Sequence, residues 1–248
     1  MSTGKFRMAL LQIAPKYFLR YAEKIPGETS ERLSRSAKEN QVYLVGGSMS
    51  ESEDEKLYNT CLVYGPDGSM LAKHRKVHLF SVNIPGKIIF NESQLLTDGH
   101  KVTTFDTPFC KVGVRICYDM AFSPFVLMYR QVGCKLLVFP GAFNMVTGPP
   151  YWELFSRSRA VESQVYFASV SPVRDEAAPY FNWRYSMLVN PSGKVIRSAA
   201  SGEELVLADV DLDYVDLMRY QMPRSKQERS DLFKIVTSTD GETNATAS

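Results

Sequence analysis

A cysteine at the end of an apolar run is the residue of this sequence with the clearest capacity for chemistry. Cys117 follows Val112–Ile116 and precedes Tyr118 and Asp119. Where a buried strand turns towards a helix, a thiol sits on a rim, and the backbone N–H groups of the turn face the group that the sulfur attacks. Acyl-transfer enzymes place their nucleophile in this way. The alternative is a structural role, because free cysteine is among the most buried residue types and usually behaves as a small hydrophobe.

Two other segments carry charged side chains that could assist such a thiol. The basic stretch Lys73–Phe80 follows the first hairpin, and a lysine that leaves the strand edge there could point at an oxyanion formed on a substrate of Cys117. Glu92 is a carboxylate in the loop Phe90–Ser93. Judged alone, the basic stretch is typical of a solvated strand end and Glu92 of a surface residue, so each segment keeps a second interpretation.

Composition limits the classes of protein that the chain can belong to. Its 248 residues are 44% hydrophobic and 12% aromatic, as in one soluble globular domain. A net charge of +2 without a basic aromatic stripe gives no reason to expect nucleic acid. The four cysteines show no CxxC spacing and the three histidines form no cluster, so we expect no metal, no cofactor and no disulfide framework.

The same sequence contains no apolar stretch of the roughly 20 residues that a membrane span requires. Its polar start leads directly into a strand-like run and resembles no signal peptide. We therefore expect a reduced, cytoplasmic chain without membrane contact, with mitochondria as the alternative location.

Hydrophobic patterns and turn signals predict an alternation of strands and helices. The first half contains an apolar strand, a helix after Pro26-Gly27, a second strand and a hairpin closed by Gly65-Pro66-Asp67-Gly68. The ranges in order are Phe6–Ile13, Glu28–Asn40, Val42–Gly47, Tyr58–Tyr64 and Ser69–Lys73.

The second half predicts a βαβαβ unit and a second hairpin. Its first helix begins with Ser123 as N-cap and Pro124 at the first helical position, and closes at Gly133. The remaining ranges are strand 112–117, strand Leu136–Phe139, loop 141–150, helix Trp152–Gln164, strand Val165–Ser169, hairpin strands Ser186–Asn190 and Lys194–Ser198, and strand Leu205–Val210. Two hairpins and crossover helices indicate an α/β sandwich with two sheets inside and helices outside.

Several motifs together resemble the nitrilase superfamily of carbon–nitrogen hydrolases, and within it the omega-amidase branch. The resemblance covers nearly the whole chain and implies a four-layer α-β-β-α sandwich over residues 4–236, followed by a disordered tail at 237–248. Its motifs are Lys76–Phe80, Pro85–Lys87, Glu92–Ser93, Gly113–Asp119, Pro140–Asn144, Trp152–Leu154, Arg157–Glu162 and Arg229–Leu232.

The resemblance assigns roles to individual residues. Cys117 becomes the nucleophile, with a pKa that we expect to be depressed, and Lys76 the cation that holds the oxyanion, aided by the backbone N–H of Tyr118. Glu92 becomes the glutamate beside the lysine. Phe143 and Asn144 become substrate-binding residues. The implied reaction converts the terminal amide of a small dicarboxylic mono-amide to acid and ammonia through a Cys thioester.

The family's general base has no counterpart in this sequence. That base is a glutamate after the second strand of the family, and a helix and strand of roughly 25–35 residues are absent at the Ile13-Ala14 junction. Arg115 also stands where the family has a small residue, and Ala121, Pro124 and Trp183–Ser186 depart from its pattern. Loss of the helix should leave apolar sheet surface uncovered.

Three functional hypotheses remain open. The chain is an omega-amidase-like hydrolase, a catalytically impaired variant or pseudoenzyme of that family, or another amidase or an amide-forming acyltransferase of the superfamily. The resemblance also implies a homodimer, with Phe125, Val126, Met128 and Tyr129 of the helix at Pro124 as candidate contacts.

Overall fold

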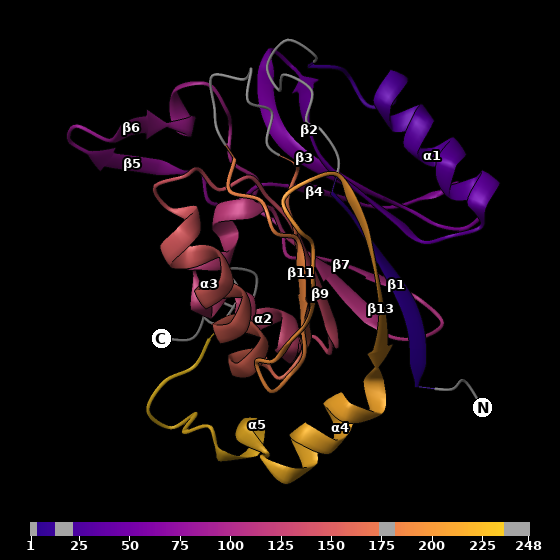
Figure 1. Ribbon diagram of the computed structural model, residues 1–248, viewed down its shortest axis with the longest axis vertical. Coiled ribbons are helices and arrows are strands. Elements are labelled where there is room, and N and C mark those ends of the chain that lie inside the picture. Colours follow the sequence, from indigo (N-terminus) through magenta and orange to yellow (C-terminus); the bar gives the residue numbers. More distant parts are fainter. Residues whose placement is uncertain (1–3, 13–21, 174–181, 236–248) are drawn as a thin grey trace, which may run out of the picture.

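Two β-sheet layers pack face to face in the computed structural model, which describes residues 4–12, 22–173 and 182–235 (Figure 1). One layer is a six-stranded sheet in the order β12-β11-β10-β9-β8-β7. Its strands are β7 (Thr103–Asp106), β8 (Lys111–Val114), β9 (Leu136–Pro140), β10 (Tyr166–Val170), β11 (Met187–Val189) and β12 (Val195–Ser198).

The predicted βαβαβ unit forms the centre of this sheet. Strands β8, β9 and β10 are parallel neighbours, with Val112 opposite Leu136 and Tyr166 opposite Leu136. Helices α2 (Ser123–Gln131) and α3 (Gly148–Ser163) make the two crossovers and lie together on one face of the sheet (Figure 1). A parallel pair needs such a crossover, because its strands run in the same direction.

Two details of the helix predictions are wrong. Phe122 is the N-cap of α2, and Ser123 instead donates its hydroxyl to Glu162 at 2.6 Å. Helix α3 begins at Gly148, four residues before the predicted start, because the two prolines after Gly148 fit the first turn, where their missing N–H groups leave no bond unmade.

The second layer is divided into two sheets. Strands β2 (Leu44–Glu53), β3 (Lys56–Tyr64) and β4 (Met70–Arg75) form an antiparallel sheet, and β1 (Lys5–Gln12) pairs with β13 (Glu204–Asp211) in another. Helix α1 (Glu28–Asn40) covers the three-stranded sheet, with Ala37 packed against Leu62 and Tyr64. The first predicted hairpin, β3-β4, therefore lies in this layer, whereas the second, β11-β12, lies in the six-stranded sheet.

The main core lies between the two layers. It combines Leu10 of β1 and Val63 of β3 with Val114, Val138 and other residues of the six-stranded sheet. With α1 outside one layer and α2 and α3 outside the other, the architecture is the α-β-β-α sandwich that the sequence predicts.

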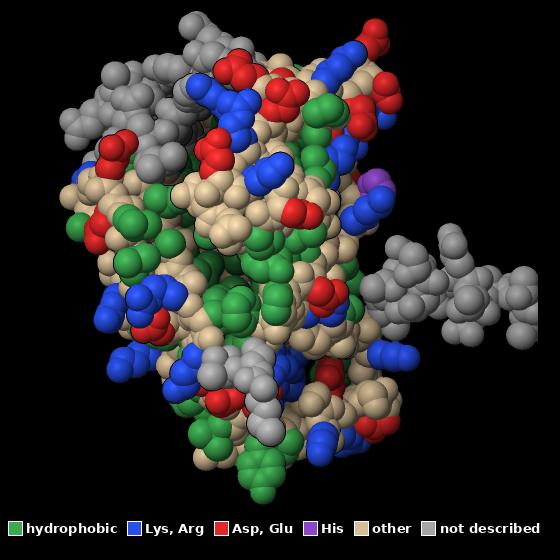
Figure 2. Space-filling view, turned by 90° about the vertical axis from the view of Figure 1, so that its right-hand side faces the viewer, with side chains coloured by type: hydrophobic (Ala, Val, Ile, Leu, Met, Phe, Trp, Pro, Cys, Tyr) green, Lys and Arg blue, Asp and Glu red, His purple; other side chains and the backbone are tan. Residues whose placement is uncertain are grey.

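The outer face of the β1-β13 sheet is uncovered among the described residues. Leu11 is 52% exposed and its strand partner Leu205 is 55% exposed, and Leu207 opposite Ala9 is 51% exposed. On the side of the molecule that carries β1, β13 and α1, hydrophobic side chains gather around a hollow (Figure 2). The predicted loss of cover over apolar sheet surface is therefore confirmed.

The remaining elements lie around this frame. They are β5 (Ser81–Ile84), β6 (Ile88–Asn91), the short 3-10 helices η2 (Glu92–Gln94) and η3 (Cys117–Ala121), α4 (Leu212–Gln221) and α5 (Arg224–Gln227). The helices within the described ranges are too short or too polar to cross a membrane. The expected tail at 237–248 lies outside the described residues.

The prediction that four residues of α2 contact a second copy requires a correction. Val126 and Tyr129 are completely buried within the chain and belong to the core under α2. Phe125 and Met128 are partly exposed, so only these two remain available to a partner.

Candidate active site

The backbone at Cys117 has the conformation of a sharp turn. Strand β8 ends at Val114, and Cys117 begins η3 with a φ of 51°, in the left-handed region that non-glycine residues rarely adopt. A non-glycine residue held there is typical of a functional turn. The N–H groups at the start of η3, including that of Tyr118, have no partner within the helix.

Gly141, directly after β9, makes this turn possible. A Cβ atom at Gly141 would lie 2.8 Å from the Cα of Cys117 and 3.1 Å from its Cβ. Only glycine allows the backbone to approach this closely. The next residue, Ala142, hydrogen-bonds the Cys117 thiol through its backbone.

Asp119 fastens the turn to the segment that carries Lys76. Its buried carboxylate accepts hydrogen bonds from the N–H of Ile116 (3.2 Å) and the N–H of His78 (2.8 Å). It also contacts Nδ1 of His78 at 2.8 Å and Nε2 of His74 at 3.4 Å. Since His74 and His78 flank Lys76 in sequence, one carboxylate sets the position of the lysine segment relative to Cys117.

Lys76 and Glu92 form a close ion pair in the wall of the site. Lys76 is 1% exposed and its Nζ donates to Oε2 of Glu92, which also accepts the N–H of Phe80 at 2.6 Å. A buried ammonium needs such a partner, because burial without one is strongly unfavourable. The structure therefore brings together the lysine and the glutamate that the sequence places sixteen residues apart.

The protonation of Cys117 differs from the expectation. Burial raises the pKa of its thiol, while the charge of Lys76 lowers it and that of Glu92 raises it. The predicted depression of the pKa is wrong for this arrangement, since burial outweighs the nearby ammonium. Attack by this sulfur therefore requires a group that removes the thiol proton.

The acids that act on Cys117 are both already engaged. Among the described carboxylates, Glu92 and Asp119 influence the thiol most strongly. Glu92 is bound to Lys76 and Phe80, and Asp119 to the two histidines and Ile116. Burial alone would raise the pKa of Asp119, but hydrogen bonds from His74 and His78 hold it well below the usual range. Asp119 is therefore ionised and poorly suited to exchange protons at neutral pH.

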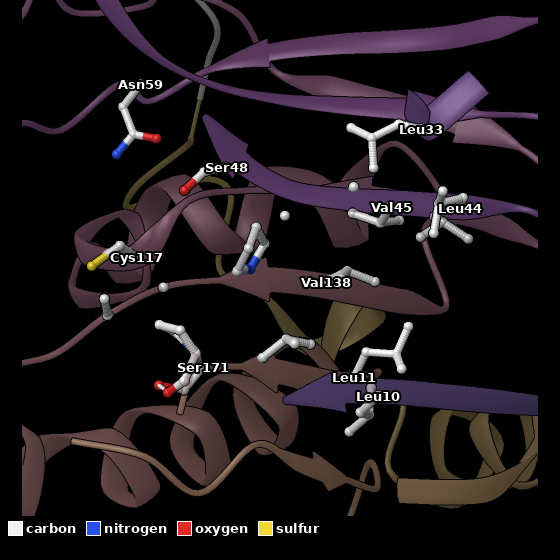
Figure 3. Close-up of a pocket in the computed structure, with 18 of the residues that line it drawn as sticks. Leu10, Leu11, Leu33, Leu44, Val45, Ser48, Asn59, Cys117, Val138 and Ser171 are labelled. Carbon is white, nitrogen blue, oxygen red and sulfur yellow. Dashed lines mark hydrogen bonds between the residues drawn. The ribbon is translucent and has the colours of Figure 1, made fainter. Parts of the chain in front are cut away.

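A cavity of about 1900 Å³ lies over the site and extends between β1 and β2. This volume exceeds the roughly 300–1,000 Å³ of most small-molecule pockets. In Figure 3 Cys117 lies at one end of the cavity, and the apolar side chains of Leu10, Leu44 and Val45 lie towards the other. Lys76, Glu92, Tyr118 and Phe143 also line the cavity.

The size of the cavity follows from the sheet order. Among the described strands, β1 pairs with β13 and β2 with β3, and the other edge of β2 is bridged at Glu51 by Glu23. Both strands line the cavity. Between β1 and β2 along the chain lies the Ile13-Ala14 junction, at which the sequence is predicted to lack a helix and a strand.

Phe143 and Asn144, the two residues predicted to bind substrate, have different surroundings. Phe143 lines the cavity and packs edge-on against Trp152, with ring centroids 5.2 Å apart. Asn144 uses its side-chain oxygen locally, accepting the N–H groups of Val146 and Thr147 at 2.9 Å each. Its role in substrate binding stays a prediction.

Sequence reasoning did not identify Asp119 or Asn59 as site residues. Asp119 is part of the motif at Cys117, and its spacing from two histidines in another segment carries no local signal. Asn59 of β3 lines the cavity beside Lys76 and looks like an ordinary strand residue in the sequence.

Arg115 is buried two residues before the nucleophile. Its guanidinium lies over the ring of Phe125, 2.7 Å from the centroid, while Nε and Nη1 have no hydrogen-bond partner. Burial lowers its pKa to about 10. The described part of the chain contains no group of three or more histidine, cysteine, aspartate or glutamate side chains that could hold a metal ion.

The sandwich of two sheets between helices, with its cysteine turn and Lys–Glu pair, defines a nitrilase-type hydrolase fold. Saccharomyces cerevisiae Nit3, described as a member of branch 10 of the nitrilase superfamily, superposes with a TM-score of 0.81 at 31% identity, covering 91% of this chain and 97% of Nit3. The Caenorhabditis elegans NitFhit protein gives a TM-score of 0.86 at 27% identity, covering 95% of this chain and 68% of NitFhit.

Sequence comparison gives the family. The family model for carbon-nitrogen hydrolases matches residues 10–220, and the chain belongs to this family of enzymes. It is 54% identical to omega-amidase NIT2 of Homo sapiens over 220 residues, or 89% of this chain and 80% of the relative. Omega-amidase NIT2 of Xenopus tropicalis gives the same identity and coverage.

Proposed function

We propose that the chain is a thiol amidase of the omega-amidase type, acting on small dicarboxylic mono-amides such as 2-oxoglutaramate and 2-oxosuccinamate. The observation that carries the proposal is the buried Lys76–Glu92 pair in the wall of the cavity that Cys117 also lines. The 54% identity to omega-amidases supports the substrate class.

In the proposed reaction the sulfur of Cys117 attacks the amide carbon, and the C–O double bond opens to an oxyanion. The ammonium of Lys76 and the N–H of Tyr118 stabilise that charge, as preorganised donors do in acyl transfer. The C–N bond then breaks, the nitrogen takes up the proton that the thiol gave up on attack and leaves as ammonia, and a thioester remains. Water attacks the thioester, which releases the acid and restores the thiol.

The position of Glu92 makes it a positioning partner for Lys76. By binding Nζ, it directs the ammonium and balances its charge, while the N–H of Phe80 fixes the carboxylate in turn. Among the described residues, Glu92 is the acid paired with Lys76 that the family pattern supplies, so it is the candidate for a weak surrogate base.

A specific observation favours the impaired variant as a second candidate. The pKa of Cys117 is raised, and the two acids that act on it are held by other groups. General acid–base help contributes about 10²–10⁴-fold in rate. We therefore expect turnover lower than that of a complete relative by about this factor.

Ammonia release from 2-oxoglutaramate tests both candidates. The purified chain and its Cys117→Ala variant are compared, and mass spectrometry of the quenched reaction is used to find an acyl group on Cys117. Slow turnover with an acylated Cys117 supports the proposal with impaired proton transfer. Full family-like turnover that Cys117→Ala abolishes would show that the missing glutamate is not needed. Absence of acylation together with absence of turnover would refute the amidase proposal.

We also propose that the chain forms a homodimer through the exposed side of α2, where Phe125 and Met128 remain accessible. Light scattering at micromolar concentration checks this proposal, and a well-folded monomer would contradict it.

A further inference from the structure

A buried amide oxygen without a hydrogen-bond partner belongs to Asn59, which lines the same cavity as Cys117 and Lys76. Asn59 is 8% exposed, and its Oδ1 atom has no hydrogen-bond partner. Its backbone carbonyl accepts the N–H of Lys76 at 2.8 Å, so Asn59 and the lysine are fixed side by side. In Figure 3 the Asn59 side chain lies at the same end of the cavity as Cys117.

An unpaired buried acceptor in this place calls for an explanation. Nearly all buried polar side-chain atoms in proteins have a partner, and those without one recur at functional sites. The groups already described at the site do not use Oδ1 of Asn59. A ligand that enters the cavity can supply the missing partner, provided that it brings a hydrogen-bond donor.

The chemistry of the site indicates which donor this is. Lys76 and the N–H of Tyr118 are donors and suit the carbonyl oxygen of a substrate, whereas Oδ1 of Asn59 is an acceptor. A primary carboxamide presents one oxygen acceptor and two N–H donors, so it can satisfy both the donors and the acceptor of the site. We propose that Oδ1 of Asn59 accepts a hydrogen bond from the NH₂ group of the substrate carboxamide and makes the site selective for primary amides over esters.

This inference rests on the proposed function and deepens it by naming the residue that recognises the leaving nitrogen. With both ends held, the plane of the amide is fixed over Cys117, which is the kind of orientation that speeds attack. An ester has an oxygen without hydrogen in the same place and cannot satisfy Asn59.

Acrylamide and methyl acrylate provide a matched pair of probes. Both alkylate a thiol at the same type of carbon, and they differ in carrying NH₂ or OCH₃ on the carbonyl. The second-order rate constant for modification of Cys117 is measured with each probe by peptide mass spectrometry. This measurement needs no turnover, so it applies to an impaired enzyme as well.

For Asn59→Ala we expect the rate with acrylamide to fall by about three- to tenfold, the range for one lost neutral hydrogen bond. The rate with methyl acrylate should stay unchanged. Asn59→Ser keeps an oxygen acceptor and should lose less of the preference for acrylamide. Two controls should leave the ratio unchanged: Asn83→Ala on the exposed part of β5, and Ser50→Ala, which removes the cross-strand neighbour of Asn59.

An equal fall in the rates with both probes would assign Asn59 a structural role and overturn the inference. An unchanged ratio of the acrylamide rate to the methyl acrylate rate in both Asn59→Ala and Asn59→Ser would also overturn it. The same shift in Ser50→Ala would also overturn it, because Ser50 would then be the partner of Asn59. If Cys117 of the unmodified chain reacts with neither probe, the nucleophile assignment and the proposed function fail together with the inference. A reactive Cys117 with an unchanged ratio leaves the proposed function intact.

Discussion

Replacement of Asp119 by alanine should destabilise the chain and disorder the nucleophile turn. The carboxylate is completely buried and binds Ile116, His78 and His74. Its removal leaves the N–H groups of Ile116 and His78 without an acceptor inside the protein. Removing one partner of a buried charged network costs about 3–5 kcal/mol. We therefore expect the free energy of unfolding of Asp119→Ala to fall by about this amount.

The surface offers a matched control. Asp106 on β7 binds Lys111 at 2.8 Å, but its side chain is 75% exposed. An exposed ion pair contributes only about 0–1 kcal/mol, so Asp106→Ala should change the free energy of unfolding by no more than that. Urea unfolding at pH 7, followed by circular dichroism, measures both variants. Equal losses in the two variants would refute the role assigned to Asp119.

The pH dependence gives a second check on the same residue. Burial would raise the pKa of Asp119, but hydrogen bonds from His74 and His78 outweigh it and depress the folded-state pKa. A depressed carboxyl pKa means that the stabilisation is complete above the unfolded-state value of about 3.9 and is lost as the pH falls through the folded-state pKa. The difference between the unmodified chain and Asp119→Ala should therefore be full at pH 7 and smaller at pH 3. A difference that grows towards pH 3 would contradict this sign.

Three further predictions concern other parts of the molecule. Gly141→Ala should slow acylation of Cys117 by up to about 10²-fold, because the added Cβ would displace the turn. Gly202→Ala is the control, because a Cβ there meets no atom within 4 Å. Equal acylation rates in the two variants would contradict the close-approach argument. Arg115→Met should raise the free energy of unfolding by about 1–3 kcal/mol by removing buried unpaired donors, and a lower urea midpoint would show that the ring contacts of Arg115 matter more. Leu207→Ser should reduce the fluorescence of a bound hydrophobic dye such as ANS, because it removes an exposed apolar side chain. The free energy of unfolding should change by no more than about 0.5 kcal/mol. Unchanged fluorescence would show that the dye binds elsewhere.

Local signals in the sequence were sufficient for most elements. The predicted helix Glu28–Asn40 has the same bounds as α1, and the turn at Gly65–Gly68 joins β3 to β4. These elements follow from periodicity and from turn residues that act over a few positions. Strands β5, β6 and β7 and helix α4 were not predicted, since they are short or depend on contacts with distant parts of the chain.

The site divides in the same way. The position of Cys117 at the end of an apolar strand marked it as a candidate, and the resemblance to the family added Lys76 and Glu92. The sequence could not determine whether the thiol is acidic, because the pKa depends on burial as well as on the neighbouring ammonium. The expectation of a depressed pKa was wrong for this reason.

Only the tertiary structure decided how these residues act on one another. It placed Asp119 between two histidines that flank Lys76, left Oδ1 of Asn59 without a partner, and formed a cavity lined by β1 and β2. Each of these features joins segments that are far apart in the sequence. Residue type and local pattern fix what a side chain can do, whereas packing of distant strands fixes what it meets.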